Sequence, residues 1–238
     1  MNLNVPRVLQ QIDDECGPYC VAQVLSFYGV SYDTADIIEA CSASYKFRDW
    51  DYQMGTYLLG QGLSVEIHTY HDAIFDPTWH ELEMSELREK LHKELSFLYS
   101  DSPRLSTLEY QAWHDVDREI SEIESAIKFI DNGGSIKLKP ISVDAIISLL
   151  SEGKPIICAF NSLLLHRMKR RFRNKADELG GTGMGHIAVI SGYKGRNFIM
   201  TDPSDWYRND RQYEVGQDEL VNSILLQDPN LIVASKKD

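Results

Sequence analysis

A predicted helix that begins at a cysteine constrains the fold of this chain more than any other stretch. Its apolar residues recur with the spacing of one helix face, at Cys20, Val21, Val24, Leu25 and Tyr28. Gly29 follows them, where a left-handed residue ends a helix. Cys16 therefore stands at the N-terminus of a helix whose packed face begins at Cys20. The helix dipole favours a thiolate at that end, so we expect Cys16 to be a nucleophile.

The alternative for Cys16 is a buried and inert thiol, which is the usual state of a free cysteine. A polar, exposed position is predicted instead by the acidic residues directly before it, Asp13, Asp14 and Glu15. Gln10, six residues upstream, can donate its side-chain amide to an oxyanion that forms where the sulfur attacks. These neighbours favour the nucleophile over the inert thiol.

A predicted hairpin brings a histidine and an aspartate together further along the chain. His186 opens an apolar strand that ends near Tyr193, and residues 194–196 form a tight turn. A second strand then returns to Asp202, so the open end of the hairpin places Asp202 beside His186. The loop before the histidine, residues 180–185, is rich in glycine. We therefore expect His186 to lie near the surface and to be mobile.

Together these segments resemble the papain-like cysteine peptidases that cleave double-glycine leader peptides of bacteriocins. The resemblance rests on Gln10, the Cys-Gly-Pro start of the helix, and the block from His186 to Asp202. It implies a papain-like α+β fold, in which the nucleophile helix of an N-terminal helical part packs on an antiparallel sheet. It also implies a catalytic triad of Cys16, His186 and Asp202, with Gln10 as the oxyanion donor. A bond after Gly-Gly is then a possible substrate, and this chain would be a free-standing relative.

The remaining elements predict a single domain, residues 1–238, with a helical insertion at residues 72–134. Outside the insertion we expect further helices at residues 33–41, 50–59, 143–150 and 217–226, and strands at 63–70, 135–140, 156–160, 186–193, 197–203 and 230–235. Inside it, leucines and isoleucines at helical spacing predict two amphipathic helices that cap the core. The resemblance covers about residues 5–70 and 136–235, and it does not extend to the insertion.

Charge limits the partners of the chain. The formal net charge is −12, which argues against nucleic acid as the main partner, because phosphate binding needs a basic surface. Residues 167–175 are the exception, since they form a strongly basic run. Such runs are usually solvated surface. The alternative is a docking patch for an acidic partner.

Cysteine and histidine spacing predicts no metal site and no cofactor. The four cysteines form no CxxC pair, and His68 and His71 have no third ligand nearby. Reduced thiols of this kind are typical of a cytoplasmic protein. No apolar run approaches the ~18 residues of a membrane-spanning helix, and the N-terminus does not resemble a secretion signal. We therefore expect no membrane insertion.

Three functions remain open. The leading one is a hydrolase, a cysteine (thiol) peptidase that acts on a peptide or another acyl donor and whose thioester is resolved by water. The second is an acyl- or peptidyl-transferase in which an amine enters the thioester. The third is a binding protein that keeps the fold without the chemistry. The complete set of Gln10, Cys16, His186 and Asp202 argues against this third function.

Overall fold

The computed structural model describes residues 1–12, 14–41, 50–71, 74–100, 102–173, 175–205 and 212–237. Within them one sheet has the strand order β2-β1-β9-β3-β6-β7-β8. Its strands are β1 (Leu63–Thr69), β2 (Ser135–Leu138), β3 (Ile156–Asn161), β6 (Gly185–Lys194), β7 (Asn197–Thr201), β8 (Tyr213–Gly216) and β9 (Asn230–Lys236). Neighbouring strands pair antiparallel except β1 and β2, which are parallel. The predicted α+β class with a mainly antiparallel sheet is confirmed.

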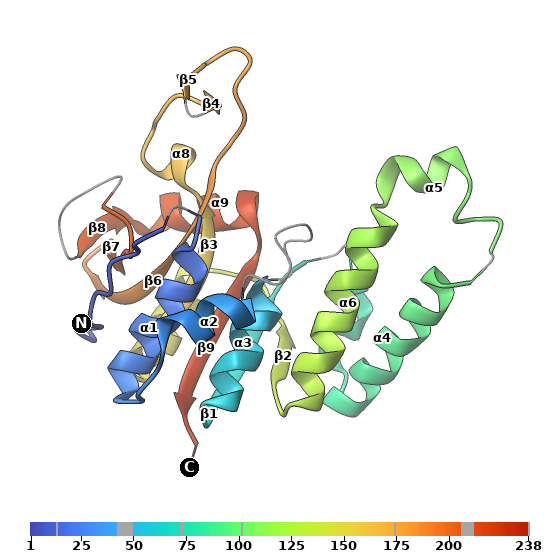
Figure 1. Cartoon of the computed structure of the whole chain (residues 1–238), viewed down its shortest axis with the longest axis horizontal. Helices are drawn as coiled ribbons and strands as arrows, with labels where there is room; N and C mark the ends of the chain where they lie inside the picture. The colour runs from blue at the N-terminus through green and yellow to red at the C-terminus, as the bar shows by residue number, and fades with distance from the viewer. Residues whose placement is uncertain are drawn as a thin grey trace.

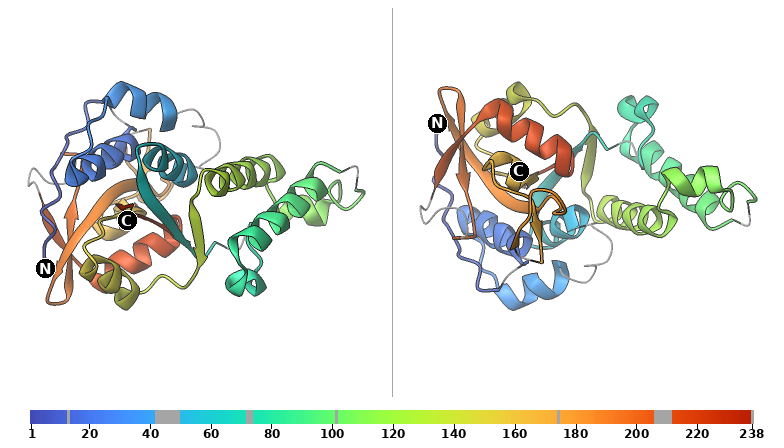
Figure 2. Two further views of the ribbon diagram at one scale, coloured as in Figure 1. Left: turned by 90° about the horizontal axis from the view of Figure 1, so that it is seen from below. Right: turned by 90° about the horizontal axis from the view of Figure 1, so that it is seen from above.

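Helices cover both faces of this sheet (Figures 1 and 2). One face carries α1 (Cys16–Tyr28), α2 (Thr34–Cys41) and α3 (Trp50–Gly60), and the other carries α7 (Val143–Ser151) and α9 (Gln217–Gln227). Side chains alternate along each strand, so successive residues enter different cores. Ile157 of β3 belongs to the apolar cluster under α1 and α3, whereas Ile156 belongs to the cluster under α7 and α9.

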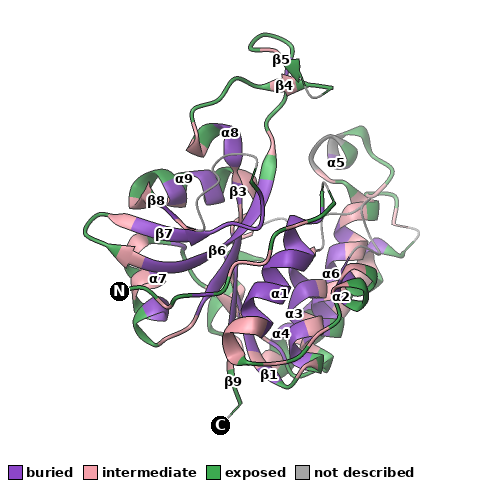
Figure 3. Ribbon diagram, turned by 60° about the vertical axis from the view of Figure 1, so that its left-hand side comes forward, coloured by how far each residue is buried: buried purple, intermediate pink, exposed green. Residues whose placement is uncertain are grey.

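The helix predicted from the cysteine is α1, and it is the buried centre of the first cluster. Every residue from Cys16 to Leu25 is buried, as Figure 3 shows. Gly29 ends the helix as expected, because its φ of 73° is left-handed and its N–H donates to the carbonyls of Leu25 and Ser26. The Sγ of Cys20 lies 3.4 Å from the carbonyl oxygen of Ile187, which fixes α1 against β6.

The segment between β1 and β2 is helical and projects to one side of the sheet (Figure 1). It comprises the short 3-10 helix η1 (Pro77–Glu81) and the helices α4 (Met84–Leu98), α5 (Leu108–Trp113) and α6 (Val116–Asp131). Phe129 of α6 is fully buried, with its ring centroid 6.1 Å from that of Tyr52. A Cβ atom on Gly55 would lie 2.8 Å from the same ring. These contacts join the segment to α3 and so to the main core.

The basic run falls on an exposed hairpin that follows α8 (Ser162–Leu165). The hairpin pairs β4 (Arg171–Phe172) with β5 (Lys175–Ala176), and Figure 3 shows it standing away from the sheet. Two of its basic side chains form ion pairs within the chain. Lys169 pairs with Glu178 at 2.8 Å, and Arg167 lies 4.0 Å from Glu219. An acidic partner for residues 167–175 stays a prediction.

Candidate active site

Cys16 is the first residue of α1, but it is not exposed as its acidic neighbours predicted. The residue is only 8% exposed, and Glu15 is 7% exposed. The cause is the packing of α3 and β6 around the helix start, since a Cβ on Gly17 would lie 3.1 Å from the Sδ of Met54 and 3.3 Å from the Cδ1 of Ile187. The backbone N–H of Cys16 has no acceptor within the helix, because it belongs to the first turn. Asp13 lies outside the described residues.

His186 faces the thiol from the start of β6. It forms a hydrogen bond with Cys16 and a second one with Asp202, where the Nε2 to Oδ1 distance is 2.8 Å. The expectation of a mobile surface histidine was wrong, because the residue is 8% exposed. Its place in β6 opposite Phe160 of β3 fixes the backbone, and the Phe160 ring meets the imidazole edge to face at 5.6 Å.

Asp202 follows β7 and lies beside His186, as the predicted hairpin required. The residue is 1% exposed, and protein groups satisfy both carboxylate oxygens. Oδ1 accepts from the backbone N–H of Ser204 at 2.8 Å in addition to His186, and Oδ2 accepts from the hydroxyl of Tyr213 at 2.8 Å. The sequence reasoning missed both added partners. In an Asp-Pro-Ser sequence the aspartate side chain commonly accepts a hydrogen bond from the backbone two residues on, so the contact with Ser204 could have been predicted. No sequence pattern predicts the contact with Tyr213.

The hydrogen bonds of His186 and Asp202 set the charges of these two side chains. Burial alone would lower the pKa of His186, but the hydrogen bonds to Asp202 and Cys16 outweigh it and raise the pKa to about 10. Burial would raise the pKa of Asp202, yet the bonds from His186, Ser204 and Tyr213 hold it below its ordinary value of 3.8. At neutral pH the pair is therefore an imidazolium beside a carboxylate.

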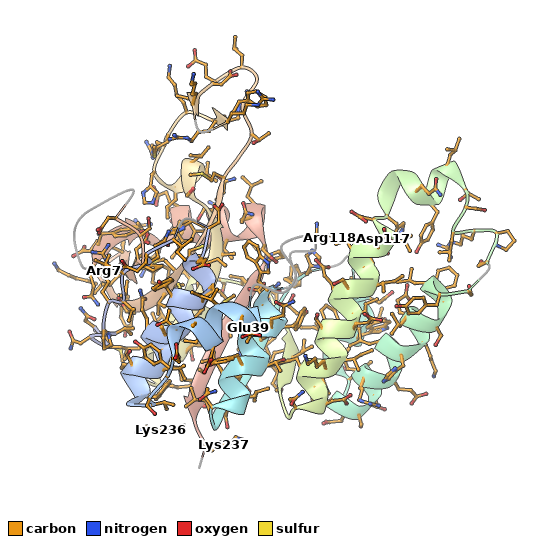
Figure 4. The ribbon with its side chains drawn as sticks, viewed as in Figure 1. Arg7, Glu39, Asp117, Arg118, Lys236 and Lys237 are labelled. Atoms are coloured by element: carbon orange, nitrogen blue, oxygen red, sulfur yellow. The ribbon has the colours of Figure 1, made fainter. Side chains whose placement is uncertain are left out.

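Gln10 lies on the N-terminal stretch and is held against the turn that follows Asp202. Its backbone N–H donates to the carbonyl of Pro203 at 2.9 Å. Arg7, on the same stretch (Figure 4), donates to the carbonyls of Asp202 at 2.7 Å and of Ser204 at 2.9 Å. The side-chain oxygen Oε1 of Gln10 is buried and accepts no hydrogen bond within the described part of the chain. The structure thus ties Gln10 to the turn after Asp202.

A cavity of about 200 Å³ opens beside the thiol. Cys16 and His186 line it, together with Trp50 and Asp51 of α3 and with Asp228 at the end of α9. Two carboxyl groups therefore stand in the wall of the space that a substrate would enter. No local sequence pattern predicts this arrangement, because Asp51 and Asp228 come from elements far apart in the chain.

The other three cysteines are buried and form no disulfide. Burial raises the pKa of Cys41 to about 12, and it raises the pKa of Cys20 and Cys158 as well. His68 bonds to Glu66 at 3.1 Å. The described residues hold no group of three side chains suited to a metal ion.

The sequence model of the Peptidase_C39 like family matches residues 2–223. The chain belongs to the Peptidase_C39 like family. Membership confirms the resemblance seen in the sequence and makes the protein a cysteine peptidase-like hydrolase. No described helix of this peptidase has both the length and the apolar character needed to cross a membrane.

Two solved structures are similar to the peptidase. One is a double glycine motif protease from an AMS/PCAT transporter, determined in complex with the leader peptide; it is 13% identical, covers 99% of this chain and 94% of that one, and gives a TM-score of 0.47. The other is a C39-like peptidase from Bacillus anthracis. It is 13% identical, the match covers 99% of this chain and 96% of that one, and the TM-score is 0.44. No curated protein matches the chain.

Proposed function

We propose that the peptidase hydrolyses a peptide or amide bond through a thioester on Cys16. One observation carries the proposal. His186 bonds to both Cys16 and Asp202, so a thiol, a base and an orienting carboxylate form one hydrogen-bonded chain. Because Nε2 of His186 is engaged by Asp202, the other ring nitrogen, Nδ1, is left for the thiol. Asp202 thereby selects the tautomer and stabilises the imidazolium.

The reaction follows from these groups. His186 already carries a proton as an imidazolium, and the Sγ of Cys16 attacks the carbonyl carbon of the substrate as a thiolate. The Gln10 side-chain amide and the Cys16 backbone N–H stabilise the oxyanion, and one such donor contributes roughly 2.7–4 kcal/mol. The imidazolium then gives its proton to the leaving amine, which departs and leaves a thioester. Water, deprotonated by His186, attacks the thioester and restores the thiol.

The substrate class rests on the family, whose members are peptidases. The resemblance of the cysteine and histidine blocks extends the proposal to a bond after Gly-Gly. An acyl donor of another kind would form the same type of thioester with Cys16. If an amine attacked this thioester in place of water, the reaction would be acyl transfer instead of hydrolysis. The products distinguish these reactions.

The test is incubation with a peptide library that includes Gly-Gly sequences, followed by mass spectrometry of peptides and protein. We expect free carboxyl products from the wild type, a trapped acyl adduct on Cys16, and neither from Cys16→Ser. An added primary amine that becomes joined to the new carboxyl end would identify a transferase. A library left intact, with no adduct on Cys16 under any condition, would contradict both reactions.

A further inference from the structure

Gln227, the last residue of α9, lines the cavity beside Cys16. The end of α9 is tied to the start of α3, because Nδ2 of Asn230 donates to Asp51 and to Asp228 at 2.8 Å each. The two carboxyl groups are also hydrogen-bonded to each other. The backbone that carries Gln227 is therefore fixed at the wall of the cavity.

The side-chain amide of Gln227 lies against Gly185, the residue directly before His186 in β6, and Gly185 lines the same cavity. A Cβ atom on Gly185 would lie 2.5 Å from Nε2 and 2.8 Å from Cδ of Gln227. The φ of Gly185 is not left-handed, so its backbone conformation does not require glycine. What the missing side chain provides is space for the amide. This space places the amide of Gln227 beside the start of β6.

The Gln227 amide differs from the other polar groups around the nucleophile because it has no partner. Cys16 and His186 are hydrogen-bonded to each other, and the Asp51 and Asp228 carboxyls are bonded within the chain. Within the described part of the chain, the amide of Gln227 forms no hydrogen bond, and the residue is half-buried. Its carbonyl oxygen and its two N–H donors are therefore available to a substrate.

We propose that Gln227 is a substrate-binding residue whose side-chain amide hydrogen-bonds a peptide group of the substrate beside Cys16. A peptide group has one N–H and one C=O, which match the acceptor and the donors of a primary amide. The cavity, about 200 Å³, is smaller than the ~300–1,000 Å³ of sites for drug-sized ligands, so it suits a short stretch of peptide. This inference rests on the proposed function, in which Cys16 attacks a peptide.

Two thiol reagents of equal chain length test the contact without a known substrate. Acetamidomethyl chloromethyl ketone contains one peptide group, and butyl chloromethyl ketone contains none. A thiolate forms a bond to the chloromethyl carbon of either reagent and releases chloride. Peptide mass spectrometry gives both rates at Cys16, and their ratio is divided by the same ratio for N-acetylcysteine. This corrected preference for the peptide group should be roughly fivefold, the contribution of one hydrogen bond. The absence of any corrected preference in the wild type would overturn the inference.

Substitution assigns the preference to Gln227. Gln227→Met keeps about the same side-chain length and removes the donors and the acceptor, so the corrected preference should disappear while the rate with butyl chloromethyl ketone stays unchanged. Gln217→Met is the matched control at the other end of α9, where Nε2 of Gln217 lies 3.4 Å from the carbonyl oxygen of Gly195. It should keep the full preference. A preference that survives in Gln227→Met would contradict the assignment.

Gly185→Ala tests the position of the amide. The new methyl group would occupy the place of the Gln227 amide, so the flexible side chain of Gln227 must turn away. We expect the preference to fall as it does in Gln227→Met, and the double variant should behave like either single variant, because both remove the same contact. Full preference in Gly185→Ala would contradict the placement of the amide. If Gly185→Ala does not fold, the wild-type preference and Gln227→Met decide the inference.

Failure of this inference is distinguishable from failure of the proposed function. Peptide cleavage by a wild type that shows no corrected preference rejects the role of Gln227 alone. A preference that depends on Gln227, without cleavage of any peptide and without an acyl adduct on Cys16, rejects the proposed function alone.

Discussion

The hydroxyl of Tyr213 donates to Oδ2 of Asp202 at 2.8 Å, opposite the oxygen that accepts from His186. Tyr213 is the first residue of β8, at the edge of the sheet, and is itself buried. The edge strand thus completes the hydrogen bonding of the Asp202 carboxylate. The negative charge of this carboxylate stabilises the imidazolium of His186. This makes Tyr213 a positioning residue for the triad.

Removing this hydroxyl should weaken both stability and turnover. Tyr213→Phe leaves one oxygen of a buried carboxylate without its donor, and hydrogen bonds to charged groups contribute about 1.5–3 kcal/mol. We expect a loss of that size in urea unfolding and a fall in kcat of about tenfold with little change in KM. Tyr193→Phe is the control, since Tyr193 has a hydroxyl 3.3 Å from that of Ser151 at the exposed end of β6. Equal effects of the two substitutions would contradict the role of Tyr213.

The raised pKa of His186 predicts how stability depends on pH. Its folded-state pKa of about 10 exceeds the ordinary 6.5, so its contribution is fully present below about pH 6.5 and is lost as the pH rises through about 10. Asp202 has a lowered pKa, so its contribution is present above pH 3.8 and is lost as the pH falls through the lowered value. Urea unfolding of wild type and His186→Ala should show a difference that is largest near pH 6 and shrinks toward pH 10. A difference independent of pH over this range would contradict the ion pair.

The close packing at the helix start predicts that a methyl group added at Gly17 destabilises the fold. In Gly17→Ala the new methyl would lie within 3.1 Å of Met54 and 3.3 Å of Ile187, so the neighbours must move. Overpacking of this kind costs about 1–3 kcal/mol. Gly60→Ala is the control, because nothing lies within 4 Å of a Cβ there. The midpoint temperature of thermal unfolding should be lower in Gly17→Ala than in the wild type and unchanged in Gly60→Ala. The reverse order would contradict the packing described for Cys16.

Substitution of Phe129 tests how residues 72–134 are joined to the main core. Phe129→Ala should cost about 3–5 kcal/mol, the range for a buried phenylalanine. Because the ring packs on Tyr52 and Gly55 of α3, we expect the loss to appear in the unfolding of the whole protein. Tryptophan fluorescence and the exposure of the buried Cys158 should then report one transition. Two separate transitions would indicate that residues 72–134 unfold as an independent cap.

Local sequence patterns were sufficient for the parts of the site that belong to one element. The capping glycine and the periodicity of residues 20–28 fixed α1, and the turn at 194–196 placed His186 beside Asp202. The periodic helices and most strand positions were likewise confirmed. In each case the interacting residues are close in the chain or are joined by a single turn.

Burial and long-range partners could not be predicted in this way. The acidic run before Cys16 predicted exposure, but Glu15 is itself covered, and the glycine-rich loop predicted a mobile His186 that pairing with β3 in fact fixes. Asp51 and Asp228 line one cavity because the start of α3 and the end of α9 lie together there, a relationship that only the assembled fold creates.

The most direct test of the proposed mechanism is the alkylation of each cysteine by iodoacetamide as a function of pH, read by peptide mass spectrometry. We expect Cys16 to react fastest, because it lines the open cavity, whereas burial raises the pKa of the other three thiols. His186→Ala should shift its profile to higher pH, Asp202→Asn should shift it less, and Gln10→Ala should leave it unchanged while suppressing turnover. A Cys16 that titrates like a free thiol and does not respond to His186→Ala would contradict the mechanism.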